Sequence, residues 1–321
     1  MSLIGYFEPM TNNPLHLSES VRRAMDAKRA VVALESTVIA HGLPRPLNLE
    51  TARDCEAAVA RAGAQAATIG IVAGRLTVGL SDKEVECFGA ACAPDGSAIE
   101  KVGLNNLAGV IRRRAWGATT VAATMRIAEL AGLRVFATGG IGGVHRGASE
   151  TFDISADLTA LGRIPLVCVC AGAKAILDLP KTVEVLETLG VPIVGYRTNE
   201  FPAFYSRASG LNVDIAVDSP EAAAEVALHH WRTGGTSAVL VCAPVPEPYA
   251  MLHEEAERAV EKAIASAERN GIRGKALTPF LLAQMKELTD GHTLAANRAL
   301  LVNNAAIAAE IAMCLAKNHL A

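Results

Sequence analysis

Aromatic residues are scarce in this chain of 321 residues: they make up 4% of it, although 51% of the residues are hydrophobic. The apolar content therefore comes mainly from Ala, Val and Leu, a composition typical of tightly packed α/β layers. The length suits one or two domains of about 150 residues each and can bury a sizeable core.

The chain also lacks a marked excess of charge of one sign. It has 30 Lys and Arg against 33 Asp and Glu, for a formal net charge of −3, and its one dense basic block is residues 112–114. We therefore expect neither a nucleic acid nor an anionic membrane surface as a partner. No signal-peptide pattern and no uncharged apolar run of about 18 residues is present, so we expect no membrane span and a cytoplasmic location.

The cysteines form no recognisable framework. There are seven, an odd number, and no C-x-x-C pair, so neither a disulfide scaffold nor a zinc cluster is indicated. Cys168 and Cys170 stand two apart in an apolar run and would share one face of a strand. Buried small apolar residues are the favoured interpretation, with a metal or redox role as the alternative.

Short apolar runs of strand length alternate with helical patterns through the first 245 residues. The runs show little polar alternation, as expected of strands covered on both faces by helices. We predict an α/β fold with a mostly parallel central sheet flanked by helices, and with ligand chemistry at the carboxyl ends of the strands. The runs are residues 30–35, 66–74, 133–140, 164–172, 191–196 and 237–244.

Beyond residue 245 the sequence shows helical patterns alone, at 248–271, 278–291 and 293–317. No linker sets them apart, so we expect this region to pack on the same body. The predicted organisation is a loose N-terminal tail, residues 1–18, followed by one α/β domain, residues 19–321. The helical C-terminal part of that domain begins at about residue 246.

Two ionisable residues stand at the ends of apolar runs. An apolar wall beside Glu35 would raise the pKa of its carboxyl and make it a usable general acid, although a capping or ion-paired carboxylate is the plainer alternative. Lys174 follows the run at 164–172, where a partly desolvated amine can attack a carbonyl carbon. The alternative is a lysine that lays its stem along apolar surface.

The segment ATGGIGGVHRGASETFDISAD, residues 137–157, gathers glycines with charged residues. Glycines let a backbone approach an anion closely, but the segment matches neither a Walker loop nor a dinucleotide fingerprint, and a plain flexible turn is the alternative. Asp153 and Asp157, four apart, would share a helix face. They would then offer oxygen ligands to a hydrated divalent ion or be solvated surface carboxylates.

In GATTVAATM, residues 117–125, two threonines precede the start of a helix. A helix start of this kind suits a phosphate, and capping by Thr119 or Thr120 explains the threonines equally well. An amine, an acid, a glycine-rich loop and this helix start together predict a Schiff-base enzyme acting on a small phosphorylated sugar.

Five blocks of the chain resemble the pseudouridine-5′-phosphate glycosidase family, over roughly residues 20–318. The resemblance implies a homotrimeric α/β enzyme with one Mn²⁺ per subunit. Such enzymes reversibly cleave the C–C glycosidic bond of pseudouridine 5′-phosphate to give uracil and ribose 5-phosphate. The blocks are ALESTVIAHGLPRPLNLETA, GATTVAATM, FATGGIGGVHRGASETFDISADL, CAGAKAILDLPKTVEVLETLGVPIVGY and NRALLVNNAAIAAEIA.

By this resemblance, Lys174 in AGAKAILD is the nucleophile that attacks C1′, opens the ribose ring and forms an imine. Glu35 in ALEST is the proton donor, and Asp153 in TFDISAD holds Mn²⁺ largely through waters. The usual two-carboxylate glycosidase route protonates a heteroatom on the leaving group. A C–C glycosidic bond has no such heteroatom, so an imine suits this reaction better. The implied substrate contacts are Lys101, Thr120, Val121, His145, Ser155, Ala156, Asp157 and, for the base, Asn297.

One segment departs from the family's pattern. The family usually runs Ser-Arg-Arg-Asp-Leu after the lysine that corresponds to Lys101, whereas KVGLNNL, residues 101–107, has neither arginine nor the aspartate. The missing charges would alter the phosphate site, and with it substrate affinity, or a contact between subunits.

Two other functions fit the same residues. A class I aldolase-like lyase would also use an imine-forming lysine on a phosphosugar, but its turnover would not depend on uracil. A metabolite-binding protein without catalysis would keep its ligand affinity after Lys174→Ala and would show no turnover.

Overall fold

The computed structural model describes residues 15–272 and 277–318. Of the predicted N-terminal tail, residues 1–14 lie outside the described residues. Residues 15–17 were expected to be loose but form strand β1 (Leu15–Leu17), which pairs in parallel with β4 (Arg75–Val78). A strand of three residues depends on its partner for stability, and the partner is not visible in the local sequence.

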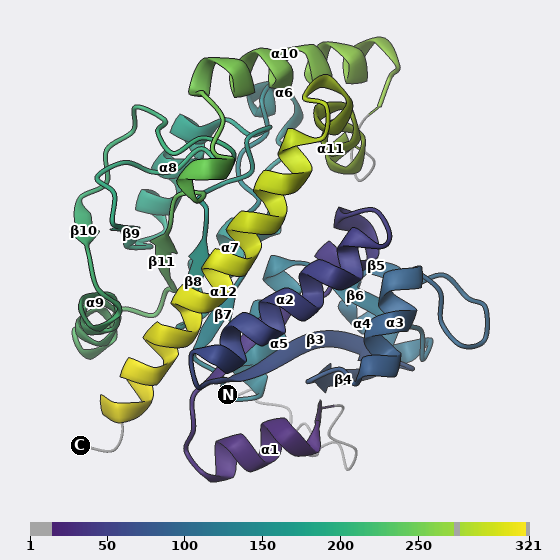
Figure 1. The fold of residues 1–321 in the computed structure, drawn as a ribbon, viewed down its shortest axis with the longest axis vertical. Coiled ribbons are helices and arrows are strands. Elements are labelled where there is room, and N and C mark those ends of the chain that lie inside the picture. The colour runs from purple at the N-terminus through teal and green to yellow at the C-terminus, as the bar shows by residue number, and fades with distance from the viewer. Residues whose placement is uncertain (1–14, 273–276, 319–321) are drawn as a thin grey trace, which may run out of the picture.

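The predicted mostly parallel sheet is confirmed. In Figure 1 the sheet lies behind α12 and α2. Its strand order is β1-β4-β3-β2-β7-β8-β11-β9-β10, with β6 pairing with β3 and β5 with β6. The antiparallel pairs are β3–β4 and β3–β6, and the other pairs are parallel. The remaining strands are β2 (Val31–Glu35), β3 (Gln65–Val72), β5 (Glu100–Val102), β6 (Gly117–Thr119), β7 (Val135–Ala137), β8 (Val167–Cys170), β9 (Ile193–Tyr196), β10 (Ile215–Val217) and β11 (Val239–Cys242).

All six predicted apolar runs contain strands of this sheet, namely β2, β3, β7, β8, β9 and β11. Their residues are almost entirely buried, because helices cover both faces. The strands that the sequence did not reveal are β1, β4, β5, β6 and β10. These have three or four residues each and lie toward the margins of the sheet.

Helices flank the sheet as expected. The long helices α2 and α12 pack together along one face, and α5 and α7 lie together on the other (Figure 1). The helical elements of the described residues are α1 (Glu19–Asp26), η1 (Val38–Gly42), α2 (Leu47–Arg61), α3 (Asp82–Ala90), α4 (Leu107–Arg112), α5 (Val121–Leu130), α6 (Ala148–Thr151), α7 (Ala156–Leu161), α8 (Leu179–Thr188), α9 (Pro220–Arg232), η2 (Glu247–Tyr249), α10 (His253–Arg269), α11 (Leu277–Leu288) and α12 (His292–Asn318).

Helix α12 joins the C-terminal region to the α/β body. It packs against β2, β7 and β8 as well as α2, so it contributes to the main hydrophobic core. By length and composition alone its segment His292–Lys317 could cross a membrane, whereas the sequence analysis predicted no segment of this kind. The structure buries 56% of its most apolar window against the sheet and α2, which is the position of a core helix.

Candidate active site

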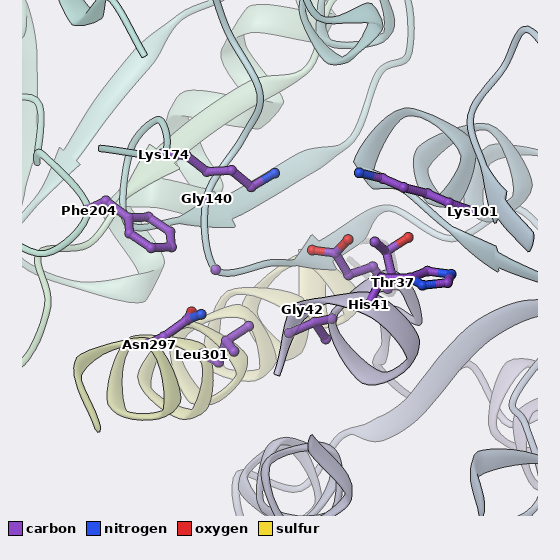
Figure 2. A pocket seen from close by; sticks show the side chains of 12 residues that line it. Thr37, His41, Gly42, Lys101, Gly140, Lys174, Phe204, Asn297 and Leu301 are labelled. Carbon is purple, nitrogen blue, oxygen red and sulfur yellow. The ribbon is translucent and has the colours of Figure 1, made fainter. Parts of the chain in front are cut away.

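Three neighbouring parallel strands, β2, β7 and β8, end at the same edge of the sheet. Glu35 is the last residue of β2, Thr138 follows β7, and Lys174 stands four residues beyond β8. This is the edge where an α/β sheet places its ligands. The pocket there, seen in Figure 2, is lined by Glu35, Thr37, Val38, His41, Gly42, Lys101, Gly139, Gly140, Lys174, Phe204, Asn297 and Leu301.

The loop after β8 places Lys174 at the pocket. Gly172 has a φ of 80°, and a Cβ on it would lie 2.1 Å from the carbonyl oxygen of Pro202, so glycine is required. The amide of Lys174 donates to the carbonyl of Ile141 at 3.1 Å. The half-buried lysine side chain extends across the pocket toward Lys101 (Figure 2). The strand end therefore delivers an amine into a partly desolvated site.

Glu35 supplies an acid to the same site. Burial raises the pKa of its carboxyl, while the positive charge of Lys174 and a hydrogen bond donated by the Thr138 hydroxyl both act to lower it. Burial is the largest of these effects, so the carboxyl holds its proton to a higher pH than an exposed glutamate does. A protonated carboxyl facing an amine can serve as a general acid.

A second cation and an imidazole stand opposite Lys174. Burial lowers the pKa of Lys101, and the like charge of Lys174 lowers it further. Burial, followed by the charge of Lys101, also lowers the pKa of His41, so this ring is neutral over most of the physiological range. His41 Nε2 is buried and has no hydrogen-bond partner among the described residues.

Asp157 is part of the scaffold beneath the pocket. Its buried carboxylate accepts hydrogen bonds from the amide of Ala122 at 3.0 Å and from the amide of Gly142 at 2.8 Å. It therefore ties the first turn of α5 to the glycine-rich loop. The idea that Asp153 and Asp157 share a helix face is wrong, because Asp153 precedes α7 while Asp157 lies within its first turn.

The threonines before α5 do not cap it with their side chains. Thr120 occupies the capping position without a side-chain hydrogen bond, and the Thr119 hydroxyl donates to the carbonyl of Ile69 at 2.8 Å. Thr120 is therefore the N-cap residue by position, but its hydroxyl makes no capping hydrogen bond, and Asp157 accepts from the amide of Ala122 instead. Val121 is the first residue of the helix.

His145 and Asp153 lie together on the glycine-rich loop. The amide of His145 donates to the carbonyl of Asp153 at 3.0 Å. Burial lowers the pKa of the His145 ring, with the Asp153 carboxylate opposing this and Lys174 adding to it. No group of three or more His, Cys, Asp or Glu side chains suited to a metal ion occurs within residues 15–272 and 277–318. A half-exposed Asp153 alone suits only an ion that keeps most of its water.

The segment that departs from the family's pattern forms a neutral turn beside Lys101. The Asn106 side chain accepts from the amide of Gly103 at 2.9 Å and donates to the carbonyl of Lys101 at 3.1 Å. A Cβ on Gly103 would lie 3.8 Å from the Thr120 hydroxyl, so the turn adjoins the start of α5. The asparagine thus holds the backbone near Lys101 without adding charge.

The structure therefore unites four of the predicted residues in one pocket: Glu35, Lys101, Lys174 and Asn297. The other predicted residues are not part of this lining. Ser155 caps α7 by accepting from the amide of Asp157 at 3.2 Å, and Ala156 begins that helix. The residues outside the lining are Thr120, Val121, His145, Asp153, Ser155, Ala156 and Asp157.

Several lining residues were not predicted. Gly139 and Gly140 belong to a glycine-rich segment that the sequence did single out, and His41 stands six residues after Glu35. Phe204 and Leu301 carry no local signal, because one lies in an irregular loop and the other on a long apolar helix. They are recognised as part of the site only when the chain is folded.

Fold and site together define an α/β enzyme of the kind that pairs an amine with a buried acid at the strand ends. Residues 20–314 match the model of the family described as indigoidine synthase A like protein, and the chain belongs to that family. It is 52% identical over 306 residues to the pseudouridine-5′-phosphate glycosidase of Caldanaerobacter subterraneus subsp. tengcongensis, covering 95% of this chain and 98% of the relative. The protein of the same name from Solibacter usitatus is 51% identical over 298 residues, covering 93% and 98%.

Two solved structures have the same fold as this chain over nearly its full length. The prealnumycin C-glycosynthase AlnA, crystallised in complex with ribulose 5-phosphate, superposes with a TM-score of 0.87 at 38% identity, covering 95% of this chain and 98% of that one. An indigoidine synthase A-like protein from Thermotoga maritima superposes with a TM-score of 0.85 at 36% identity, covering 96% and 99%.

Proposed function

We propose that this protein is a pseudouridine-5′-phosphate glycosidase, which cleaves the C–C glycosidic bond of its substrate reversibly to uracil and ribose 5-phosphate. The observation that carries the proposal is the convergence of Lys174, Glu35 and Lys101 on one pocket. The names of relatives about 50% identical over nearly their full length support it, as does the binding of ribulose 5-phosphate by AlnA.

In the proposed mechanism, Lys174 Nζ bonds to C1′ while the C1′–O4′ bond breaks, and the proton that the nitrogen then loses goes to O4′. The lone pair freed on the nitrogen forms a C=N bond to C1′ as the bond from C1′ to the uracil carbon breaks and that carbon takes a proton from Glu35. Water hydrolyses the resulting iminium, which releases ribose 5-phosphate, restores the amine and returns one proton to Glu35. Burial raises the pKa of Glu35, so the needed proton stays on its carboxyl to a higher pH than on an exposed glutamate.

The phosphate is expected to lie near Lys101 and the start of α5, within reach of Thr120, Val121 and His145. Ser155, Ala156 and Asp157 are expected to border the sugar. The base would then reach Asn297, whose buried side chain makes no hydrogen bond recorded for the described residues.

Asp153 is proposed to hold Mn²⁺ largely through waters, since the described residues contain no group of three or more His, Cys, Asp or Glu side chains that could hold a metal ion. A hydrated divalent ion there would supply positive charge beside His145 and the phosphosugar. We further propose a homotrimer located in the cytoplasm. The expected partners are small molecules rather than nucleic acids or membranes.

The test is to mix the protein with Mn²⁺, ribose 5-phosphate and uracil and to follow pseudouridine 5′-phosphate by mass-resolved chromatography. Product that depends on uracil supports the glycosidase. Consumption of the sugar phosphate without uracil would favour an aldolase-like lyase. Binding without any turnover would indicate a metabolite-binding protein.

A further inference from the structure

The two residues that follow Glu35 reach across the sheet to β6. The Ser36 hydroxyl oxygen accepts a hydrogen bond from the amide of Thr119 at 2.9 Å, and the Thr37 hydroxyl donates to the carbonyl of Ala118 at 3.3 Å. Both strands also pair with β3, but at different positions along it: β2 with residues 65–69 and β6 with residues 70–71. The side chains therefore connect the end of β2 directly to the end of β6.

Ser36, Thr119 and Thr124 form a chain of buried hydroxyls, each 0% exposed. The Thr119 hydroxyl donates to the carbonyl of Ile69 at 2.8 Å and accepts from the Thr124 hydroxyl at 2.9 Å. Ser36 Oγ lies 3.3 Å from Thr119 Oγ1, and Ser36 is the donor there, because the single hydrogen of the Thr119 hydroxyl goes to Ile69. One arrangement of hydrogens thus satisfies all three hydroxyls, and a fully satisfied buried network of this kind is rigid.

Groups that line the pocket stand on both sides of this hydroxyl chain. On one side, Glu35 immediately precedes Ser36. On the other side, Lys101 pairs in register with Ala118, the residue before Thr119. The hydroxyl chain therefore lies between the strand that carries the proposed proton donor and the strands that carry the proposed phosphate cation.

The substrate needs these two groups at a matching separation. Its ribose joins C1′ to the phosphate through a few covalent bonds, and in Figure 2 the Lys101 side chain enters the pocket from the side opposite Lys174. A phosphate held by Lys101 brings C1′ to the amine and the acid only if the distance between the groups suits the sugar. A misplacement of about 1 Å costs roughly a hundredfold in rate, so a rigid spacer between the strands favours catalysis.

We propose that Ser36 and Thr119 are positioning residues, whose hydrogen bonds set the separation between Glu35 and the phosphate site at Lys101. Neither of them lines the pocket, so they act through their neighbours and not by touching the substrate. The inference rests on the proposed function. It adds to that function a route by which phosphate binding at one strand end contributes to bond cleavage at another.

The test is a double-mutant cycle on the cleavage of pseudouridine 5′-phosphate. Thr119→Val replaces the hydroxyl by a methyl group, and we expect it to lower kcat/KM by roughly tenfold to a hundredfold. In a Lys101→Met background the phosphate anchor is already lost, so the same substitution should cost at most about threefold. Ser36→Ala should behave in the same way. Thr119→Ser keeps the hydroxyl and should retain most of the wild-type activity.

A matched control separates positioning from a loss of stability. Ser237 is also buried, and its hydroxyl donates to the carbonyl of Gly190 at 2.6 Å just before β11 begins, at the edge of the sheet opposite the pocket. Ser237→Ala should destabilise the protein in urea while leaving kcat/KM unchanged.

Three outcomes would overturn the positioning role. They are an equal cost of Thr119→Val in both Lys101 backgrounds, full activity in both Thr119→Val and Ser36→Ala, and a loss of kcat/KM in Ser237→Ala as large as that in Thr119→Val. Wild-type protein that does not cleave pseudouridine 5′-phosphate would instead refute the proposed function, and with it the positioning role that rests on that function.

Discussion

Burial acts on single residues of the site in the direction that the chemistry needs. It favours the uncharged forms of ionisable groups, so Glu35 retains a proton while His41 and Lys101 release theirs more readily. The hydrogen bond from Thr138 and the charge of Lys174 limit the effect on Glu35. The pKa of Glu35 therefore depends on opposing effects, and a single substitution can change it.

Replacing Thr138 by Val tests this balance. The Thr138 hydroxyl favours the ionised carboxylate, so its loss should raise the pKa of Glu35 further. The protonated acid then persists to higher pH, and the alkaline fall of kcat/KM should move upward by about half a unit or more. The pH profile of the cleavage reaction measures this. Thr188→Val, on an exposed face of α8, should leave the profile unchanged, and a downward shift in Thr138→Val would contradict the argument.

Lys101 should act on phosphate binding more than on bond cleavage. Replacing it by Met removes a charged hydrogen bond worth about 1.5–3 kcal/mol, which corresponds to an increase of at least tenfold in the KM for the phosphorylated substrate. Steady-state kinetics would show KM changing more than kcat. Lys181→Met, which removes an exposed ion pair with Asp178, is the control. A fall confined to kcat would assign Lys101 a different role.

At the scale of elements, the helices and strands that could be predicted are those with a recognisable pattern in their own residues. Six buried strands and the long helices have continuous apolar runs or helical periodicity, and they were predicted. The short strands β4, β5, β6 and β10 exist through their pairing, and β5 and β6 bring Lys101 beside the start of α5. Lys101 could be predicted only from the family resemblance, because no local pattern places it at the site.

The connection between elements through Asp157 has a measurable energetic consequence. Asp157→Ala would leave the buried amides of Ala122 and Gly142 unpaired, at about 1–3 kcal/mol each. We expect the free energy of unfolding in urea to fall by about 2–6 kcal/mol. Asp153→Ala, at a half-exposed residue, should cost far less when measured without metal. Equal losses in the two variants would show that Asp157 does not have this role.

At the scale of the whole molecule, the site exists because distant segments meet. Its lining runs from Glu35 to Leu301, and α12 supplies the last two members while it packs on the sheet and α2. Strand-end chemistry was predictable because parallel strands share an edge. The approach of α12 and of the Phe204 loop was not, because it depends on tertiary packing.

The shared core predicts that the helical C-terminal region and the sheet unfold together. Heating should give coincident transitions by far-ultraviolet circular dichroism and by the fluorescence of Trp116 and Trp231. An earlier loss of helical signal, with the tryptophan environment retained, would show that the C-terminal helices form a separate unit.

The central claim is that Lys174 is the amine that bonds to C1′. The most direct measurement is to reduce a mixture of the protein and ribose 5-phosphate with borohydride and to locate the adduct by peptide mass spectrometry. We predict one reduced adduct on Lys174, which is lost in Lys174→Ala and kept in Lys181→Ala. An adduct on another lysine, or trapping that persists in Lys174→Ala, would contradict the account.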